Sequence, residues 1–416
     1  MYFIYRLLTN LILILSPLII IFRLIKKKED KKRYKEKFCL FSKKRGKGKL
    51  IWFHGSSVGE ILSVVPIIQK LEKNKSLDRI LITSSTLSSS KVLKKFKLKK
   101  TIHQFYPIDN IIFVRKFLNY WKPSLAIFIE SEIWPCMYTS LNNNKIPLIL
   151  LNARLTKKTY NRWKMLGNFS KSIFDKIKIA YPQNQETKFF LNKLNTKKIK
   201  YYGNLKFIEN IQEKQSKINK RLKDQLKNKK IWVASSTHFN EEIFCAKTHL
   251  ELKRKIKNLL TIIIPRHIHR AKEIAKDIES LGLKTTTHSS KVKNLKNTDI
   301  YIVDEFGETK KFHKLGFSVF LGGSIIQRGG QNPLEAARLG AKIFHGPNID
   351  NFQDVYKLLK LFKISKKINS FKELAHSISF KKDKKSAKKI KNIGKTILKK
   401  TIKEIENLIN NEFKKT

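Results

Sequence analysis

The stretch KLIWFHGSSVGEILSVVPIIQKL, residues 49–71, contains the pattern that decides the fold. It opens with a short apolar run, 49–55, and closes with a longer run, 61–71, whose apolar residues recur at helical spacing. Gly55, at the end of the first run, and Gly59 permit a tight turn, and the two serines between them can cap a helix. The stretch therefore predicts a buried strand, a loop and a helix in succession.

The same unit recurs along the chain, which is the pattern of a parallel α/β fold. A charged, polar segment at 208–229 separates two halves of comparable size, and no short-period repeat is visible. Further strands are predicted at 79–86, 124–131, 146–153, 230–237, 259–267, 298–305, 316–324 and 341–347. We therefore expect two Rossmann-like domains that face a cleft, with ligands outside the carboxyl ends of the strands.

The composition limits the classes of protein to consider. The 416 residues include 41% hydrophobic side chains, which excludes a disordered or fibrous chain. The formal net charge of +57 favours polyanionic neighbours, namely nucleic acid, anionic lipid or phosphorylated substrates. The three cysteines are widely spaced, and the ten histidines show no metal-binding spacing, so neither a disulfide framework nor a metal site is expected.

The N-terminal segment has the composition of a membrane helix. Residues 7–25 read LLTNLILILSPLIIIFRLI, and KKKEDKKRYKEK follows at once. A helix of this length reaches about 28 Å, close to the hydrocarbon thickness of a bilayer. A signal peptide is disfavoured because no small-residue cleavage site follows, whereas a helix lying in the membrane interface stays open. The lysines place the rest of the chain on the cytoplasmic side.

These patterns predict five parts of the chain. They are a membrane anchor (1–27), a first Rossmann-like domain (28–207), a linker (208–229), a second Rossmann-like domain (230–380) and a basic C-terminal helix (381–416). The last part either crosses back to the first domain or forms a membrane-surface patch.

Three motifs of the first half can carry chemistry. HGSSVGE, residues 54–60, places Glu60 on the first turn of a helix, either pointing into the cleft or serving the helix dipole. IESEIWP, residues 129–135, supplies Glu130 and Glu132, of which one can enter the cleft while the other binds locally if the chain turns there. YGNLKF contains Lys206, which could neutralise a phosphate. No GxGxxG is present, so dinucleotide binding has no support.

The second half offers a nucleotide site built at successive strand ends. Arg266 follows an apolar strand, where a guanidinium can bind phosphate through two hydrogen bonds, although a surface arginine is the alternative. A glycine-rich loop then leads through Asn332 and Pro333 into a helix that carries Glu335. A carboxylate there can accept hydrogen bonds from ribose hydroxyls, and free N–H groups attract phosphate.

Ten motifs occur in family order between about residues 33 and 361. They are RYKEKF, WFHGSSVGE, IESEIWP, NARLTKKTYNRW, GNLKF, ASSTH, PRH, FGE, GGS and NPLEAA. With them the chain resembles the 3-deoxy-D-manno-oct-2-ulosonic acid (Kdo) transferases of lipid A assembly. These are membrane-anchored, two-domain, GT-B-type glycosyltransferases of Gram-negative bacteria.

The resemblance implies that the domain 28–207 binds the acceptor and the domain 230–380 binds the CMP-sugar. It also implies a role for each matching residue. Glu60 looks like the general base, and Glu130 and Lys206 look like the residues that assist the transition state. The residues that look like the CMP site are Pro265, Arg266, Phe306, Gly307, Glu308, Asn332, Pro333, Leu334 and Glu335.

The resemblance also implies the substrates and the location. The donor is CMP-Kdo, the acceptor is the tetraacylated, bisphosphorylated disaccharide precursor of lipid A (lipid IVA), and no cofactor or metal is needed. Attack of the acceptor inverts the anomeric centre. The expected partners are these substrates and the anionic lipid of the bacterial inner membrane, with the catalytic domains on its cytoplasmic face and no specific nucleic acid.

Two departures and two alternatives stand beside this assignment. Gln331 stands where the family has His, and Gly55 where Ala or Thr is usual, which leaves substrate detail open. One alternative is a GT-B transferase that moves the sugar of a UDP-sugar to a lipid acceptor. The other is a membrane-tethered nucleic-acid-binding protein, against which the dispersed basic residues and the lack of a zinc-finger or RNP-like motif argue.

Overall fold

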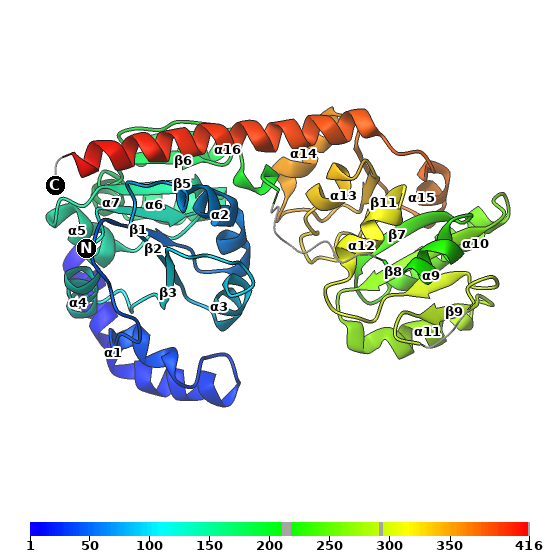
Figure 1. The fold of residues 1–416 in the computed structure, drawn as a ribbon, viewed down its shortest axis with the longest axis horizontal. Helices are drawn as coiled ribbons and strands as arrows, with labels where there is room; N and C mark the ends of the chain where they lie inside the picture. The colour runs from blue at the N-terminus through cyan, green and yellow to red at the C-terminus, as the bar shows by residue number, and fades with distance from the viewer. Residues whose placement is uncertain (210–217, 291–293, 415–416) are drawn as a thin grey trace. The chain divides into compact units, whose positions relative to one another are not determined.

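The computed structural model describes residues 1–209, 218–290 and 294–414 of the chain, shown in Figure 1. The chain divides into two compact units. Unit 1 comprises residues 1–212 and 393–416, and unit 2 comprises residues 213–392. Residues 210–217 of the expected linker lie outside the described residues, as do the last two of the expected C-terminal helix.

Unit 1 is built on a six-stranded parallel sheet in the order β3-β2-β1-β4-β5-β6. Its strands are β1 (Leu50–His54), β2 (Arg79–Ser84), β3 (Thr101–Phe105), β4 (Leu125–Ile129), β5 (Leu148–Ala153) and β6 (Ile179–Pro182). The chain starts in the middle at β1, runs outward to β3 and then returns to β4 on the other side of β1. The carboxyl ends of β1 and β4 therefore form the topological switch point, where open α/β sheets bind ligands.

Helices surround this sheet and explain why its strands are continuous apolar runs. Every residue of β1, β4 and β5 is buried, as expected for a parallel sheet covered on both faces. Large side chains such as Trp52, Trp121 and Phe128 fill the core. The helical segments are η1 (Arg33–Phe38), α2 (Val58–Leu71), α3 (Leu87–Leu93), α4 (Ile111–Trp121), α5 (Pro135–Asn143), α6 (Lys157–Met165), α7 (Asn168–Phe174), α8 (Gln185–Lys193) and η2 (Leu205–Phe207).

Unit 2 repeats the architecture with a seven-stranded parallel sheet in the order β13-β12-β11-β7-β8-β10-β9. The strands are β7 (Lys230–Thr237), β8 (Leu259–Pro265), β9 (Thr285–Thr287), β10 (Ile300–Ile302), β11 (Ser318–Leu321), β12 (Lys342–His345) and β13 (Ser365–Lys367). The helices are α9 (Lys220–Leu226), α10 (Glu241–Lys253), η3 (Ile268–Arg270), α11 (Ala271–Glu279), α12 (Thr309–Leu315), α13 (Leu334–Arg338), α14 (Gln353–Leu361) and α15 (Phe371–Ser377). Two parallel sheets confirm the predicted α/β class.

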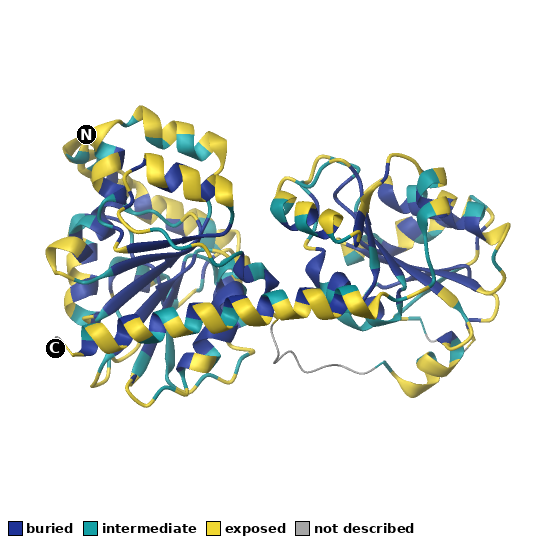
Figure 2. Cartoon of the chain, turned by 90° about the horizontal axis from the view of Figure 1, so that it is seen from above, coloured by how far each residue is buried: buried dark blue, intermediate teal, exposed yellow. Residues whose placement is uncertain are grey.

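The apolar N-terminal segment forms one helix, α1 (Tyr2–Ile25), which lies against unit 1. The Tyr5 hydroxyl donates to Asp109 at 2.7 Å, and the Asn110 amide donates to Asn10 at 2.6 Å. Most of its large apolar side chains remain exposed, as Figure 2 shows near the N-terminus. By length and composition, α1 is the one helix among the described residues that could cross a membrane. The helix thus has a polar docking face and a broad apolar face.

The basic tail forms the long helix α16 (Lys384–Phe413), whose second part belongs to unit 1. Glu404 accepts hydrogen bonds from Lys200, Tyr181 and Tyr202 beside β6. Gly394 allows the helix to pass so near η2 that an added Cβ would lie 2.1 Å from the Phe207 carbonyl oxygen.

Replacing Gly394 by alanine should therefore destabilise unit 1. In an ordinary helix interior the same change stabilises by about 0.5–1 kcal/mol. Here the overlap with backbone has to be relieved by moving η2 or the helix, so we expect a loss of about 1–3 kcal/mol. Denaturant unfolding of Gly394→Ala beside Lys395→Ala, at an exposed position of the same helix, measures the difference. A Gly394→Ala chain as stable as the parent would show that the approach is not close in solution.

Candidate active site

Glu60 lies at the switch point of unit 1, on the first turn of the helix that follows β1. Ser57 is the N-cap of α2, and Glu60 completes a capping box with it. The Glu60 carboxylate accepts from the Ser56 N–H at 2.6 Å and from the Ser57 hydroxyl at 2.8 Å. A carboxylate has about four lone-pair positions, so Glu60 can still accept a proton from a substrate hydroxyl.

The surroundings of Glu60 raise the pKa of its carboxyl group above the value that it has in water. Burial raises the pKa of Glu60 to about 7, and the charges of Glu132 and Glu130 add to this effect against the lowering hydrogen bonds from Ser57 and Ser56. A base whose pKa lies near the working pH combines a useful deprotonated fraction with a strong pull on the proton. The Glu60 side chain thus caps α2 and is also suited to act as a base.

Glu130 follows β4 on the other side of the switch point and faces Lys206. Its φ of 57° turns the chain sharply at the strand end, and its side chain is buried. The Lys206 ammonium lies 3.3 Å from Glu130 Oε1, and the Asn152 amide donates to the same oxygen at 3.4 Å. The two residues predicted to assist the transition state are therefore in contact.

The position of Lys206 is set by two asparagines and by α16. Asn204 caps η2 by accepting from the Lys206 N–H at 2.9 Å, and Asn152 accepts from the Leu205 N–H at 2.9 Å. Gly394 of α16 passes against the far end of the same turn at Phe207. Asn152 therefore connects the Lys206 turn to Glu130, a role that the sequence analysis did not assign.

Glu132 turns away from Glu130 and binds locally, so the two carboxylates do not act as a pair. Glu132 Oε2 lies 3.1 Å from His54 Nε2 and accepts from the Trp134 indole at 2.9 Å. Although burial acts to raise the pKa of Glu132, the hydrogen bond and electrostatic attraction of His54 and the hydrogen bond from Trp134 outweigh it, and the net pKa is lowered. Glu132 is thus held as a carboxylate.

The residues predicted for CMP binding in unit 2 follow neighbouring strands. Pro265 ends β8 and Arg266 follows it, while Phe306, Gly307 and Glu308 follow β10, which pairs with β8. The side chains of Arg266 and Phe306 are exposed, whereas Glu308 pairs with Lys311 on the next turn. The topology thus brings these two groups to one edge of the sheet.

The third predicted group, residues 332–335, reaches the same edge through the loop after β11. Asn332 accepts from the Leu334 N–H at 3.0 Å, and Pro333 stands at the N-cap of α13. The expectation of a free N–H at this point is therefore wrong for Leu334, because the asparagine side chain already satisfies it. Glu335 lies 3.9 Å from the ring of His313, whose pKa is lowered by burial to about 4.

The sequence analysis missed Glu241, the first residue of α10. Its buried carboxylate accepts from four backbone N–H groups, those of His238 at 3.0 Å, Gly323 at 2.6 Å, Ser324 at 3.1 Å and Ile325 at 3.0 Å. These groups follow β7 and β11, the strands at the switch point of unit 2. The N–H groups of Gly323 and Ser324 in the glycine-rich GGS loop are therefore directed at Glu241.

The two departures from the family pattern have different structural settings. At Gly55, an added Cβ would lie 3.1 Å from both the Glu60 Cβ and the Ile129 Cδ1, so these side chains would have to shift slightly to accept it. Gln331 is half-buried, and its backbone carbonyl accepts a hydrogen bond from the Tyr356 hydroxyl at 3.0 Å. A larger residue at position 55 would therefore press on the candidate base.

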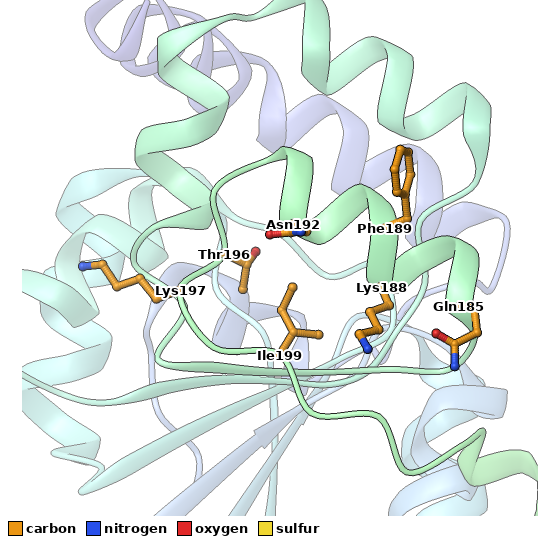
Figure 3. A pocket seen from close by; sticks show the side chains of 7 residues that line it. All are labelled: Gln185, Lys188, Phe189, Asn192, Thr196, Lys197 and Ile199. Carbon is orange, nitrogen blue, oxygen red and sulfur yellow. The ribbon is translucent and has the colours of Figure 1, made fainter.

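A separate pocket of about 420 Å³ lies along α8 (Figure 3). The Thr196 Oγ1 in it has no hydrogen-bond partner within the part of the chain that the structure describes. None of the predicted site residues lines it; the lining residues are Gln185, Lys188, Phe189, Asn192, Thr196, Lys197 and Ile199. Within the same described ranges, no three His, Cys, Asp or Glu side chains gather as a metal cluster would.

Comparison with known proteins extends the similarity over nearly the whole chain. Residues 32–209 match the family model described as 3-deoxy-D-manno-octulosonic-acid transferase (kdotransferase). The 3-deoxy-D-manno-octulosonic acid transferase of Rickettsia bellii is 34% identical over 396 residues, which covers 95% of this chain and 94% of that protein. The Haemophilus influenzae protein of the same name is 26% identical over 84% of each chain.

Solved structures share the architecture at low sequence identity. The UDP-GlcNAc 2-epimerase of Neisseria meningitidis superposes with a TM-score of 0.51 at 15% identity, covering 85% of this chain and all of that one. This likeness and the two parallel sheets confirm a GT-B-type fold with two Rossmann-like units. The R. bellii match shows that the chain belongs to the 3-deoxy-D-manno-octulosonic acid (Kdo) transferase family, a family of glycosyltransferases.

Proposed function

We propose that this protein transfers Kdo from CMP-Kdo to lipid IVA, with inversion at the anomeric carbon and without a metal ion. The observation that carries the proposal is Glu60, a carboxyl group with a pKa of about 7 at the switch point of unit 1. A sugar hydroxyl is a weak nucleophile, and a positioned base contributes about 10²–10⁴-fold to the rate of its attack.

In the proposed reaction, Glu60 takes the proton of the acceptor hydroxyl while the oxygen of that hydroxyl bonds to C2 of Kdo. The bond between C2 and the phosphate oxygen breaks, and CMP leaves with the electron pair. Attack from the face opposite the leaving group inverts the anomeric centre. Lys206, held by Glu130 at 3.3 Å, supplies positive charge at the same strand ends.

Unit 2 supplies the donor site. The exposed guanidinium of Arg266 is suited to bind the leaving phosphate, and Glu335 is suited to accept from the ribose hydroxyls. A cationic side chain can stabilise a phosphate leaving group without a cofactor or metal.

Helix α1 is proposed as the anchor to the cytoplasmic face of the inner membrane. Contacts of Tyr5 and Asn10 with Asp109 and Asn110 hold it along unit 1, while its apolar face is exposed. These contacts favour a helix lying in the membrane interface over one that leaves unit 1 to span the bilayer. The lysines that follow α1 add attraction to anionic lipid of roughly 1 kcal/mol each.

Donor choice tests this proposal. Purified protein in detergent with EDTA is given lipid IVA and either CMP-Kdo or UDP-N-acetylglucosamine, and the products are measured by mass spectrometry. We expect Kdo-bearing lipid and released CMP from the first mixture and no product from the second, at a rate that EDTA leaves unchanged. Turnover of the UDP-sugar alone, or loss of activity with EDTA, would contradict the proposed donor or the metal independence.

A further inference from the structure

Ser56 lies between β1 and the candidate base, and each of its polar groups has a partner. Its backbone N–H donates to Glu60 Oε2 at 2.6 Å, and its hydroxyl donates to the Ser85 hydroxyl oxygen at 2.8 Å. Its backbone carbonyl accepts from the Ser89 hydroxyl at 3.3 Å, and the Thr86 hydroxyl lies 3.5 Å from the same oxygen. The residue that contacts the base is therefore held from outside its own helix.

The three residues that hold Ser56 belong to one segment, residues 85–89, which is called the serine segment below. It comprises the end of the loop after β2 and the start of α3. Strand β2 pairs with β1 in parallel along its length, so the two loops leave the same edge of the sheet. Thr86 caps α3 by accepting from the Ser89 N–H at 3.3 Å, which brings both hydroxyls to the Ser56 carbonyl.

The hydroxyl hydrogens of Thr86 and Ser89 can be assigned from these distances. The two hydroxyl oxygens lie 2.6 Å apart, so one hydrogen is used between them and the other is left for the Ser56 carbonyl. Ser89 is the nearer of the two to that carbonyl, and it is fully buried, so its hydroxyl has no water to bind instead. Thr86 therefore donates to Ser89, and Ser89 donates to Ser56.

These contacts set the direction of the N–H groups that bind Glu60. The Ser56 carbonyl and the Ser57 N–H belong to one planar peptide and point in opposite directions. Holding the carbonyl at Ser89 thus directs the Ser57 N–H toward Glu60 Oε2, at 3.5 Å, beside the shorter bond from the Ser56 N–H. The carboxylate is oriented by backbone whose own position depends on the serine segment.

We infer that Ser85 and Ser89 are positioning residues for the reaction, which hold Ser56 so that its backbone orients the base Glu60. This inference rests on the proposed function of Glu60 as the base. Neither serine contacts Glu60, and both act through Ser56. A displacement of about 1 Å at a reacting group can cost about 10²-fold in rate, so groups that hold the base affect the reaction without touching the substrate.

The double variant Ser85→Ala/Ser89→Ala tests the inference because it removes both contacts to Ser56. We expect kcat for Kdo transfer to fall about tenfold, with the KM for CMP-Kdo unchanged because the proposed donor residues lie in unit 2. The matched control is Ser88→Ala/Ser90→Ala, which removes two hydroxyls from the same helix. Ser88 is exposed and Ser90 accepts from the Arg33 guanidinium at 3.4 Å, so the control should keep the wild-type rate.

Two further measurements separate positioning of the base from a general effect on folding. In the Glu60→Gln background the double variant should cause no further loss of rate, because the group that the serines position is already gone. In the wild-type background the midpoint of the pH–rate profile should move to higher pH, because the hydrogen bond from the Ser56 N–H lowers the Glu60 pKa.

A double variant as fast as the Ser88→Ala/Ser90→Ala control, or one that slows Glu60→Gln by the same factor as the wild type, would overturn the inference. Should the double variant not fold, Ser85→Ala is compared with Ser85→Thr, which keeps the hydroxyl at this half-buried position. Equal rates for these two would also overturn it. If Glu60→Gln itself were as fast as the wild type, the proposed function would fail instead.

Discussion

Replacing Glu60 by glutamine should slow Kdo transfer by about 10²–10⁴-fold while making the folded chain more stable at alkaline pH. Glutamine cannot take a proton from the acceptor hydroxyl, so the contribution of the base is lost. It can still occupy the third position of the capping box with Ser57, so α2 should begin at the same residue. The variant therefore separates the base from the cap.

The gain in stability follows from the direction of the pKa change. The folded protein holds the Glu60 proton more tightly than the unfolded chain, because the pKa rises from 4.5 to about 7 on folding. This favours folding below about pH 4.5, and the contribution is lost as the pH rises through about 7. At pH 8 the wild type carries the cost of a charged, half-buried carboxylate, and Glu60→Gln should be more stable by about 1–3 kcal/mol.

Thermal unfolding at pH 5 and pH 8 measures this effect, with Glu186→Gln as control. Glu186 also stands in the first turn of a helix of unit 1, but it is exposed, so its replacement should change neither the rate nor the pH dependence. If Glu60→Gln were less stable than the wild type at pH 8 and equally active, Glu60 would be a capping residue alone.

Replacing Glu241 by glutamine should strongly destabilise unit 2. The two carboxylate oxygens of Glu241 each accept from two backbone N–H groups. An amide has one oxygen, so two of these donors would face its NH₂ group. Each buried donor left without an acceptor costs about 1–3 kcal/mol, so we expect a loss of about 2–5 kcal/mol.

The same change should weaken donor binding, because Glu241 holds the loops at the switch point of unit 2. Denaturant unfolding gives the stability, and isothermal titration with CMP gives the affinity. Glu251→Gln, on the same helix and in a surface ion pair with Arg254, is the control and should stay within about 0.5 kcal/mol. A Glu241→Gln chain as stable as this control would show that the four hydrogen bonds do not organise the loops.

The sequence predicted the central strands and missed the edges of both sheets. Each of the nine predicted stretches contains a strand, and the four missed strands, β3, β6, β9 and β13, are the outermost ones. A central parallel strand is buried on both faces and shows as a continuous apolar run, whereas an edge strand such as TTT or SKK does not. Edge strands such as β9 and β13 were therefore missed because they are not buried on both faces and lack a continuous apolar run.

The site could be predicted only in part for a similar reason. Motifs next to strand ends located Glu60 and Glu130, because parallel strands bring their carboxyl ends to one edge. The serines were predicted to cap the helix, but the capping box that Ser57 forms with Glu60 was not predicted. The partners of Glu132 and Glu241 were not predicted either, since His54, Gly323 and Ser324 lie far from them in sequence and act through ring or backbone atoms. Such contacts leave no periodic pattern.

The most direct test of the account is the pH dependence of Kdo transfer from CMP-Kdo to lipid IVA by the wild type and Glu60→Gln. We predict that the wild-type rate rises with pH, with its midpoint near the Glu60 pKa of about 7, and then levels off. Glu60→Gln should be slower by about two orders of magnitude or more and lack this midpoint. Equal rates for the two proteins, or no Kdo-bearing product from the wild type, would contradict it.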